Sequence, residues 1–179
     1  MGSAATSYVW GMRGAYAGIG LFLLFLQLLP LETAPRGWVG PDFLLALTFV
    51  WVARRPDLAP VTLVAAMFLL ADLLLQRPPG LWAALALITT ELVRIRANDF
   101  RDMIFPVEWA VISAFTLGFY VVFMVVWSVA MTYDISFGML IVQAILTILA
   151  YPAVAAASSM FLGVTKAAPG QTDAQGRKL

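Results

Sequence analysis

Acidic side chains within long apolar runs are the residues of this chain whose type and position could support chemistry. Four carboxylates lie inside or at the edge of such runs: Asp42, Asp72, Glu91 and Glu108. The sequence has no histidine and no cysteine, which excludes imidazole and thiolate ligands, a Ser-His-Asp arrangement and disulfides. The four carboxylates are also too few and too dispersed to indicate a proton relay. We therefore expect no enzymatic activity, no metal and no cofactor.

Three of these carboxylates fit structural roles. Asp42 and Glu108 each closely follow a proline, and proline favours the first turn of a helix, where a carboxylate meets the positive end of the helix dipole. Glu91 lies three residues before Arg94, so the two side chains can pair on one helix face. We interpret all three as mainly structural, while a binding role for Asp42 stays open.

Asp72 is harder to explain. It is flanked by apolar residues in Ala71-Asp72-Leu73-Leu74-Leu75, near the predicted end of a helix, where the dipole disfavours negative charge. An unpaired carboxylate in a membrane costs at least ~2.5 kcal/mol, so a partner is expected. Arg77, Gln27 or a group on another protein could supply it. We slightly favour the internal pair with Arg77.

The composition places these residues in a membrane. The chain of 179 residues is 62% hydrophobic and 12% charged, with a mean hydropathy of +0.90. We predict an all-α, polytopic protein in which residues 1–13 form an N-terminal lead, 14–165 the transmembrane domain and 166–179 a mobile tail. The six predicted transmembrane helices are 14–31, 41–53, 60–76, 81–96, 107–131 and 137–164. A short helix within 97–106 is expected on the inner membrane surface.

The positive charges orient the chain. Of the 11 Lys and Arg residues, only Arg36 and Arg77 fall in one of the two alternating sets of loops. The other set holds Arg13, Arg54, Arg55, Arg94, Arg96, Arg101, Lys166, Arg177 and Lys178. Because cytoplasmic loops carry an excess of Lys and Arg, we predict that both termini are cytoplasmic.

Pro152 lies inside the last predicted helix. Its ring removes one backbone donor, so we expect a kink and a freed carbonyl at Ile148. Small residues follow the proline and would allow another helix to approach closely: Ala153, Ala155, Ala156, Ala157, Ser158 and Ser159.

Several short motifs, in order along residues 26–85, resemble those of the rod shape-determining protein MreD family. These are Leu26-Gln27-Leu28-Leu29-Pro30-Leu31, Pro41-Asp42, Trp51, Arg55-Pro56, Asp72-Leu73-Leu74 and Gly80-Leu81-Trp82-Ala83. Tyr151-Pro152 and a short charged tail are similar to the family's C-terminal end. In the family pattern Asp-Leu-Leu-x-Gly-x-x-x-Gly, Asp72 and Gly80 match, while Gln76 replaces the first glycine.

This resemblance implies a non-enzymatic scaffold of the bacterial cell-elongation complex, which directs peptidoglycan synthesis at the inner membrane. The implied partners are an MreC-like protein and, through it, MreB filaments and the RodA–penicillin-binding protein 2 synthase. The lipid bilayer surrounds the protein, and no nucleic acid is expected. The family fold is similar to that of S-components of energy-coupling-factor transporters. The candidate partner-contact or structural residues are Asp42, Asp72, Arg77, Gly80, Trp82 and Pro152.

Two other classes of protein stay open. A substrate-binding membrane subunit of a vitamin or metal-ion transporter would need an outward-facing pocket with polar groups near Asp72, Trp38 and Trp82. A lipid-modifying enzyme is less favoured, because clustered acids and a metal site are missing. A closed pocket around a small molecule would favour the transporter subunit. A lipid-facing flank of small and aromatic residues would favour the scaffold.

Overall fold

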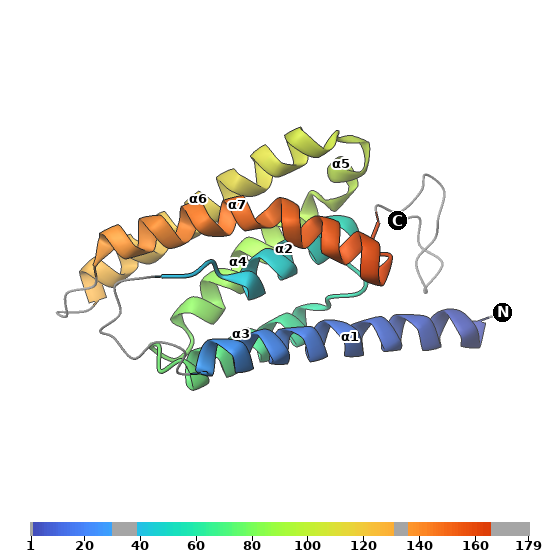
Figure 1. The fold of residues 1–179 in the computed structure, drawn as a ribbon, viewed down its shortest axis with the longest axis horizontal. Helices are drawn as coiled ribbons and strands as arrows, with labels where there is room; N and C mark the ends of the chain where they lie inside the picture. Colours follow the sequence, from blue (N-terminus) through green and yellow to red (C-terminus); the bar gives the residue numbers. More distant parts are fainter. Residues whose placement is uncertain (1, 30–38, 131–135, 166–179) are drawn as a thin grey trace.

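The computed structural model describes residues 2–29, 39–130 and 136–165, and every regular element in these ranges is an α-helix (Figure 1). The all-α prediction is therefore confirmed for the described chain. The helices are α1 (Gly2–Leu28), α2 (Phe43–Arg54), α3 (Val61–Leu74), α4 (Leu81–Ile95), α5 (Ala97–Asp102), α6 (Phe105–Ala130) and α7 (Phe137–Leu162).

Three helices are long and apolar enough to cross a membrane: Thr6–Leu28 within α1, Phe105–Val129 within α6, and α7. The helices α6 and α7 have 26 residues each, which corresponds to about 39 Å of length. The helices α2 and α3 are apolar but shorter, and α4 has 15 residues, including Glu91 and Arg94. A membrane protein is thus indicated, while the count of six spans and the orientation stay predictions.

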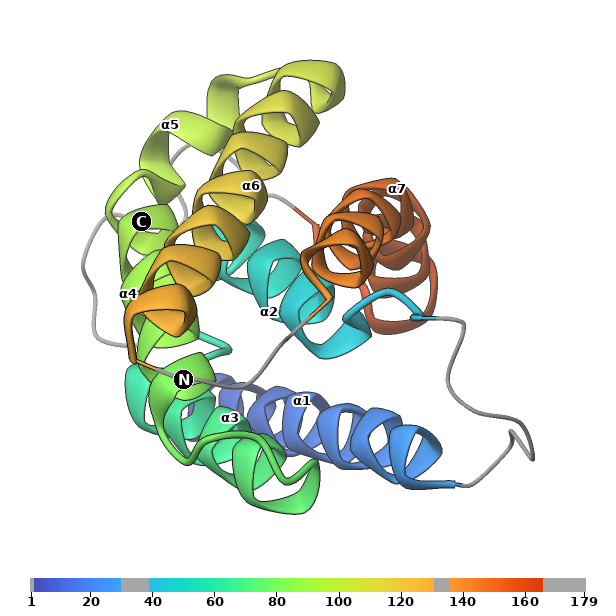
Figure 2. The same ribbon diagram turned by 90° about the vertical axis from the view of Figure 1, so that its left-hand side faces the viewer.

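The short helix α2 forms the centre of the bundle. Ten of its 12 residues, from Leu44 to Ala53, are buried, and it packs against α7, α4 and α1 (Figure 2). A helix that is apolar on all sides is typical of a buried position. Neighbouring helices therefore cover a segment that is too short to cross the hydrocarbon layer alone.

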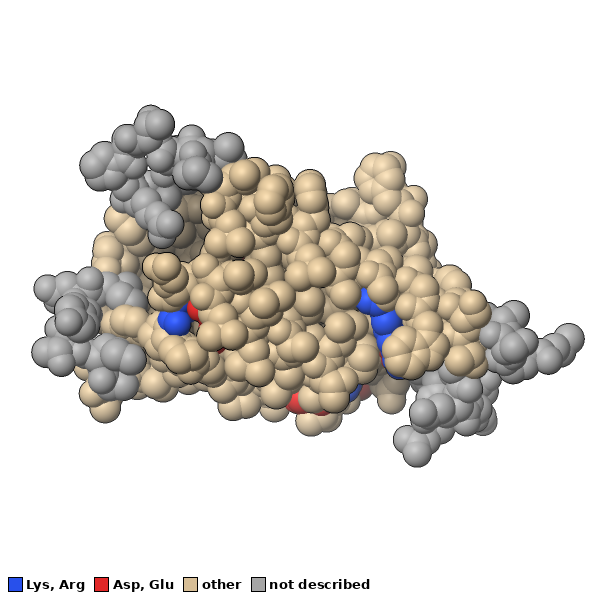
Figure 3. All heavy atoms as spheres, turned by 90° about the horizontal axis from the view of Figure 1, so that it is seen from below, with Lys and Arg blue, Asp and Glu red and all other residues tan. Residues whose placement is uncertain are grey.

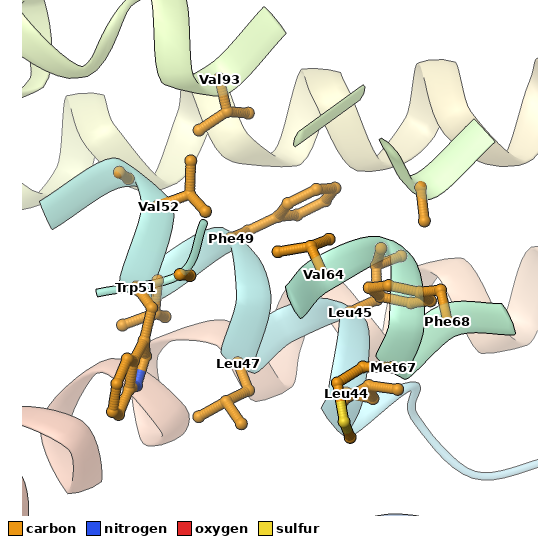
Figure 4. Close-up of a cluster of buried hydrophobic side chains, with 14 of the residues drawn as sticks. Leu44, Leu45, Leu47, Phe49, Trp51, Val52, Val64, Met67, Phe68 and Val93 are labelled. Atoms are coloured by element: carbon orange, nitrogen blue, oxygen red, sulfur yellow. The ribbon is translucent and has the colours of Figure 1, made fainter. Parts of the chain in front are cut away.

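The core beside α2 is built from large side chains of three helices. Figure 4 shows Phe49 and Leu45 of α2 close to Val64 and Phe68 of α3, with Val93 of α4 nearby. All five side chains are at most 1% exposed. Because lipid tails are as apolar as leucine, close packing and hydrogen bonds hold such helices together in a membrane.

The helix α1 closes the other side of the core. The hydroxyl of Tyr16 lies 2.8 Å from Thr48 Oγ1, and the Tyr16 ring packs against Trp51 with a centroid distance of 5.4 Å. Gly20 faces Met67 and Leu44 so closely that a Cβ atom there would displace the end of the Met67 side chain. The glycine therefore permits the close approach of α1 to α2 and α3.

One helix boundary differs from the prediction, and one predicted short helix is confirmed. The helix α1 begins at Gly2 rather than at residue 14. Arg13 marks a change in polarity and not the start of the helix, and residues 2–13 contain no proline that would interrupt it. The short helix expected within 97–106 is present as α5. The predicted mobile tail, 166–179, and the loop with Arg36 and Trp38 lie outside the described residues.

The surface carries few charges. On the face drawn in Figure 3, most atoms belong to uncharged residues, and the charged side chains occupy a few small areas. Large apolar side chains are exposed instead on the long helices, including Phe22 (58%), Val129 (85%) and Phe161 (82%). Such a surface suits lipid better than water.

Candidate functional site

The structure brings five of the six candidate residues together at one end of α3. Asp42 precedes α2, Asp72 and Arg77 lie in the last turn of α3 and just after it, and Gly80 and Trp82 lie at the start of α4. The contacts given below join these five residues, which we call the polar cluster. The sixth candidate, Pro152, lies within α7.

Asp72 caps the helix that follows its own. Its side chain is fully buried, and its Oδ2 atom accepts hydrogen bonds from the backbone N–H groups of Gly80 (3.0 Å) and Ala83 (3.1 Å). These donors belong to the unpaired first turn of α4, where the helix dipole favours negative charge. The α4 amides therefore take the place of the ion pair with Arg77 that we had favoured from the sequence.

Two residues with positive φ shape the turn that makes this cap possible. Gln76 has a φ of 53° and Gly80 a φ of 90°, in the region that residues with a Cβ atom rarely adopt. Gln76 occupies the position of the first glycine in the MreD-like pattern. The backbone at this position thus has the geometry that a glycine would best accommodate.

Arg77 lies between two side chains of the polar cluster, those of Asp42 and Trp82. Its Nη1 atom is 3.8 Å from Asp42 Oδ2, and its guanidinium carbon lies 4.3 Å from the centroid of the Trp82 ring, in the geometry of a cation–π contact. Arg77 is therefore held by one carboxylate and one aromatic face, and its side chain is still 24% exposed.

Trp82 connects the turn to α6. Its ring makes edge-on contacts with Phe119, Tyr120 and Phe123, at centroid distances of 4.8, 5.5 and 4.7 Å. Edge-to-face aromatic pairs of this kind add attraction beyond their buried area. Trp82 thus anchors the start of α4 against the middle of α6.

Asp42 joins α2 to α7. Its Oδ1 atom accepts a hydrogen bond from the backbone N–H of Leu45 at 3.0 Å, so the helix-capping role predicted from the Pro-Asp pair is confirmed. Its own backbone N–H donates to Thr147 Oγ1 at 2.9 Å. Because Thr147 is the eleventh of the 26 residues of α7, the polar cluster lies near the middle of the long helices.

At the opposite end of α3, three arginines surround the loop that joins α2 to α3. Arg13 donates to the carbonyl of Asp57 at 3.0 and 3.2 Å, and Arg94 donates to the carbonyls of residues 56 and 59, both at 2.6 Å. Arg55 pairs with the Asp57 carboxylate at 3.1 Å. The hydrogen bond to this carboxylate raises the pKa of the Arg55 guanidinium. Arg94 also bonds Glu91 at 2.9 Å, as the sequence spacing predicted.

A buried ion pair connects α2, α6 and α7. Glu108 is fully buried, and its Oε1 atom lies 3.3 Å from Arg54 Nε and accepts a hydrogen bond from the Tyr151 hydroxyl at 2.8 Å. Arg54 also donates to the carbonyl of Ala155 at 3.3 Å. Sequence reasoning assigned Glu108 to the helix dipole and missed these partners. The available signal was that a carboxylate in an apolar helix needs a cation.

The carbonyl freed by Pro152 has a partner on α6. The indole Nε1–H of Trp109 donates to the carbonyl of Ile148 at 3.0 Å. This is the carbonyl expected to lose its helical donor because of the proline. Pro152 therefore creates a contact between α6 and α7.

An apolar groove of about 290 Å³ lies between α1, α2 and α7. All but one of its lining residues are apolar, and two of them, Ala157 and Ser158, have short side chains. We call this feature the α1–α7 groove; it is lined by Ile19, Leu23, Phe43, Leu47, Val154, Ala157, Ser158, Phe161 and Leu162.

Within the described ranges, no group of three or more His, Cys, Asp or Glu residues is placed to hold a metal ion. Comparisons of the chain with protein-family models, with curated proteins and with solved structures found no match. The role of the chain therefore has to be inferred from its own residues.

Proposed function

We propose that the chain is a non-enzymatic scaffold of the bacterial cell-elongation complex in the inner membrane, and that it binds a transmembrane helix of an MreC-like partner. The observation that carries the proposal is the α1–α7 groove, because its walls combine small residues with apolar and aromatic ones. Small residues let a second helix approach closely, and van der Waals packing drives helix association in lipid.

The use of the polar residues supports a scaffold over an enzyme. Asp42 and Asp72 bind the first turns of α2 and α4, and Glu108 binds Arg54 and Tyr151. The Asp72 and Glu108 carboxylates each join one helix to another, and the Asp42 carboxylate caps α2. A rigid bundle of this kind can present a surface of constant shape to its partners.

The charges agree with the proposed orientation, in which six helices cross the membrane and both termini are cytoplasmic. Arg13, Arg55 and Arg94 gather around one loop, whereas Arg77 follows the opposite end of α3. The larger group would face the cytoplasm. In that orientation the MreC-like partner would connect the chain to MreB filaments and to the RodA–penicillin-binding protein 2 synthase.

A substrate-binding subunit of a vitamin or metal-ion transporter is the second candidate. Such a subunit places several polar groups around a small molecule. The α1–α7 groove has a single polar residue, Ser158, in its lining. An apolar groove of this kind fits a helix or lipid tail better than a vitamin, so we favour the scaffold.

Two tryptophan substitutions on α7 test the proposal. Ala157 lines the α1–α7 groove, whereas Ala156 is exposed but is not among the lining residues. In the native host, Ala157→Trp should reduce the amount of MreC-like protein that co-purifies, because the indole fills the groove. Ala156→Trp should leave it unchanged. Equal recovery of the partner with both variants would contradict the proposal.

A further inference from the structure

Arg96 is an exposed cation without a hydrogen-bond acceptor in the described part of the chain. It follows the last residue of α4. Within the described ranges, no carboxylate forms an ion pair with Arg96, and its side chain donates no hydrogen bond. Five other arginines, by contrast, bind a carboxylate or a backbone carbonyl: Arg13, Arg54, Arg55, Arg77 and Arg94.

The contacts that Arg96 does make leave its hydrogen-bond donors unused. Its guanidinium carbon lies 5.5 Å from the centroid of the Phe115 ring on α6, and a ring attracts a cation without forming an ordinary hydrogen bond. The negative end of the α4 dipole also favours a cation at this position. A guanidinium nevertheless carries five N–H donors, and a charge beside lipid-facing residues is costly unless it is paired. Arg96 therefore needs an acceptor from outside the bundle.

An apolar surface leads along α4 to this arginine. Ile88, Leu92 and Ile95 are exposed, and Ile95 is 76% accessible; we call these three residues the α4 stripe. Because residues four apart lie on the same face of a helix, Ile88, Leu92 and Arg96 follow one another along α4. The short helix α5 then connects this end of α4 to α6 (Figure 1). The charged group thus lies at one end of a surface suited to a hydrocarbon chain.

The chemistry of this surface selects a phospholipid as the missing partner. A phosphate accepts two parallel hydrogen bonds from a guanidinium, and arginine is especially suited to such groups. An acyl chain would cover the α4 stripe, which a soluble anion would leave bare. Basic residues near a membrane surface attract lipids of net negative charge. In a zwitterionic lipid, the headgroup's own ammonium competes with Arg96 for the phosphate.

We propose that Arg96 and the α4 stripe bind an anionic phospholipid, with the phosphate at Arg96 and an acyl chain along Ile88, Leu92 and Ile95. None of these residues lines the α1–α7 groove. The lipid and a partner helix in that groove therefore use different surfaces, and the lipid site does not depend on the proposed scaffold function.

Thermal unfolding of the purified protein in detergent tests the proposal. Phosphatidylglycerol should raise the unfolding midpoint more than phosphatidylcholine with the same acyl chains, because a ligand that binds the folded protein stabilises it. Arg96→Gln should abolish most of this difference. Lys178→Gln removes the same charge from the end of the chain and should preserve the difference. A full difference in Arg96→Gln, or none in the wild-type protein, would overturn the proposal.

A soluble headgroup separates a lipid site from a site for free anions. Glycerol 3-phosphate, at the same phosphate concentration, should leave the unfolding midpoint unchanged, because it has no acyl chain to cover the α4 stripe. A rise as large as that produced by phosphatidylglycerol would assign Arg96 to a free anion and contradict the lipid site.

Photo-crosslinking in native membranes identifies the occupant without a measurement of stability. A photoreactive residue in place of Ile95 should crosslink to phospholipid, and adding Arg96→Gln should reduce the share of phosphatidylglycerol among the crosslinked lipids. The same residue at Val129, near the opposite end of α6, should show no such change. A crosslink from position 95 to a protein would show that a partner covers the α4 stripe, and the proposal would then be wrong.

Discussion

The Oδ2 atom of Asp72 accepts a hydrogen bond from the backbone N–H of Ala83 at 3.1 Å. A carboxylate near the end of α3 is thereby placed at the start of α4. The positive end of the α4 dipole attracts this carboxylate and offsets its repulsion by the negative end of the α3 dipole. This relationship explains why an acidic residue can persist among leucines. It also ties the packing of α3 and α4 to the short turn between them.

Replacement of Asp72 should weaken the fold. Asp72→Ala leaves the amides of Gly80 and Ala83 without their acceptor, so we expect the free energy of unfolding in detergent to fall by about 1–3 kcal/mol. Asp72→Asn retains an acceptor oxygen and should cost less. Asp102→Ala, at an exposed position, is the control. If Asp72→Ala were as stable as that control while recovery of the partner fell, the carboxylate would act on another protein instead.

A glycine at position 76 should stabilise the protein. Gln76 has a φ of 53°, which costs a residue with a Cβ atom roughly 1–2 kcal/mol, while glycine adds about 0.5–1 kcal/mol of backbone entropy cost. Gln76→Gly should therefore raise the free energy of unfolding by about 0.5–1 kcal/mol. Leu75→Gly, where φ is −87°, should lower it. A loss of stability in both variants would rule out strain at Gln76.

The pair formed by Arg54 and Glu108 should show strong coupling in a double-mutant cycle. Arg54→Met leaves a fully buried carboxylate without its cation and should cost about 3–5 kcal/mol. Adding Glu108→Gln removes the unpaired charge and should recover part of that loss. Unfolding of the two single variants and the double variant measures the coupling. Simple addition of the two single effects would mean that the ion pair contributes nothing specific.

Labelling of single cysteines tests the proposed orientation, and the natural sequence contains no cysteine to interfere. We expect a cysteine at Thr33 to react with an impermeant reagent added to intact cells, and a cysteine at Asn98 to react only after the cells are opened. The loop arginines motivate this expectation. Labelling of both positions from the same side would exclude the proposed arrangement of six spans.

Much of the helix order follows from the sequence, because apolar runs interrupted by Arg-Pro and Pro-Gly segments leave few alternatives for helix boundaries. The capping role of Asp42 and the pairing of Glu91 with Arg94 are local, and both were predicted from spacing alone. Proximity along the chain was sufficient in each case. The same reasoning identified the Ile148 carbonyl as a free acceptor.

The long-range partners could not be predicted in this way. The Glu108 contacts to Arg54 and Tyr151 join three helices, and a single sequence carries no information about which helices become neighbours. For Asp72, counting side-chain charges favoured Arg77, although backbone amides supplied the partner. Helix ends carry partial charges that no residue type reveals. The start of α1 was missed because a change in polarity need not coincide with the end of a helix.

Site-specific photo-crosslinking in native membranes tests most directly whether the α1–α7 groove holds a partner helix. A photoreactive residue at Ala157, inside the groove, should crosslink to the host's MreC-like protein, because the partner's side chains would lie in van der Waals contact with that position. The same residue at Ala156, outside the groove, should crosslink mainly to lipid. A crosslink to that partner from Ala156 but not from Ala157 would contradict the groove as its binding surface.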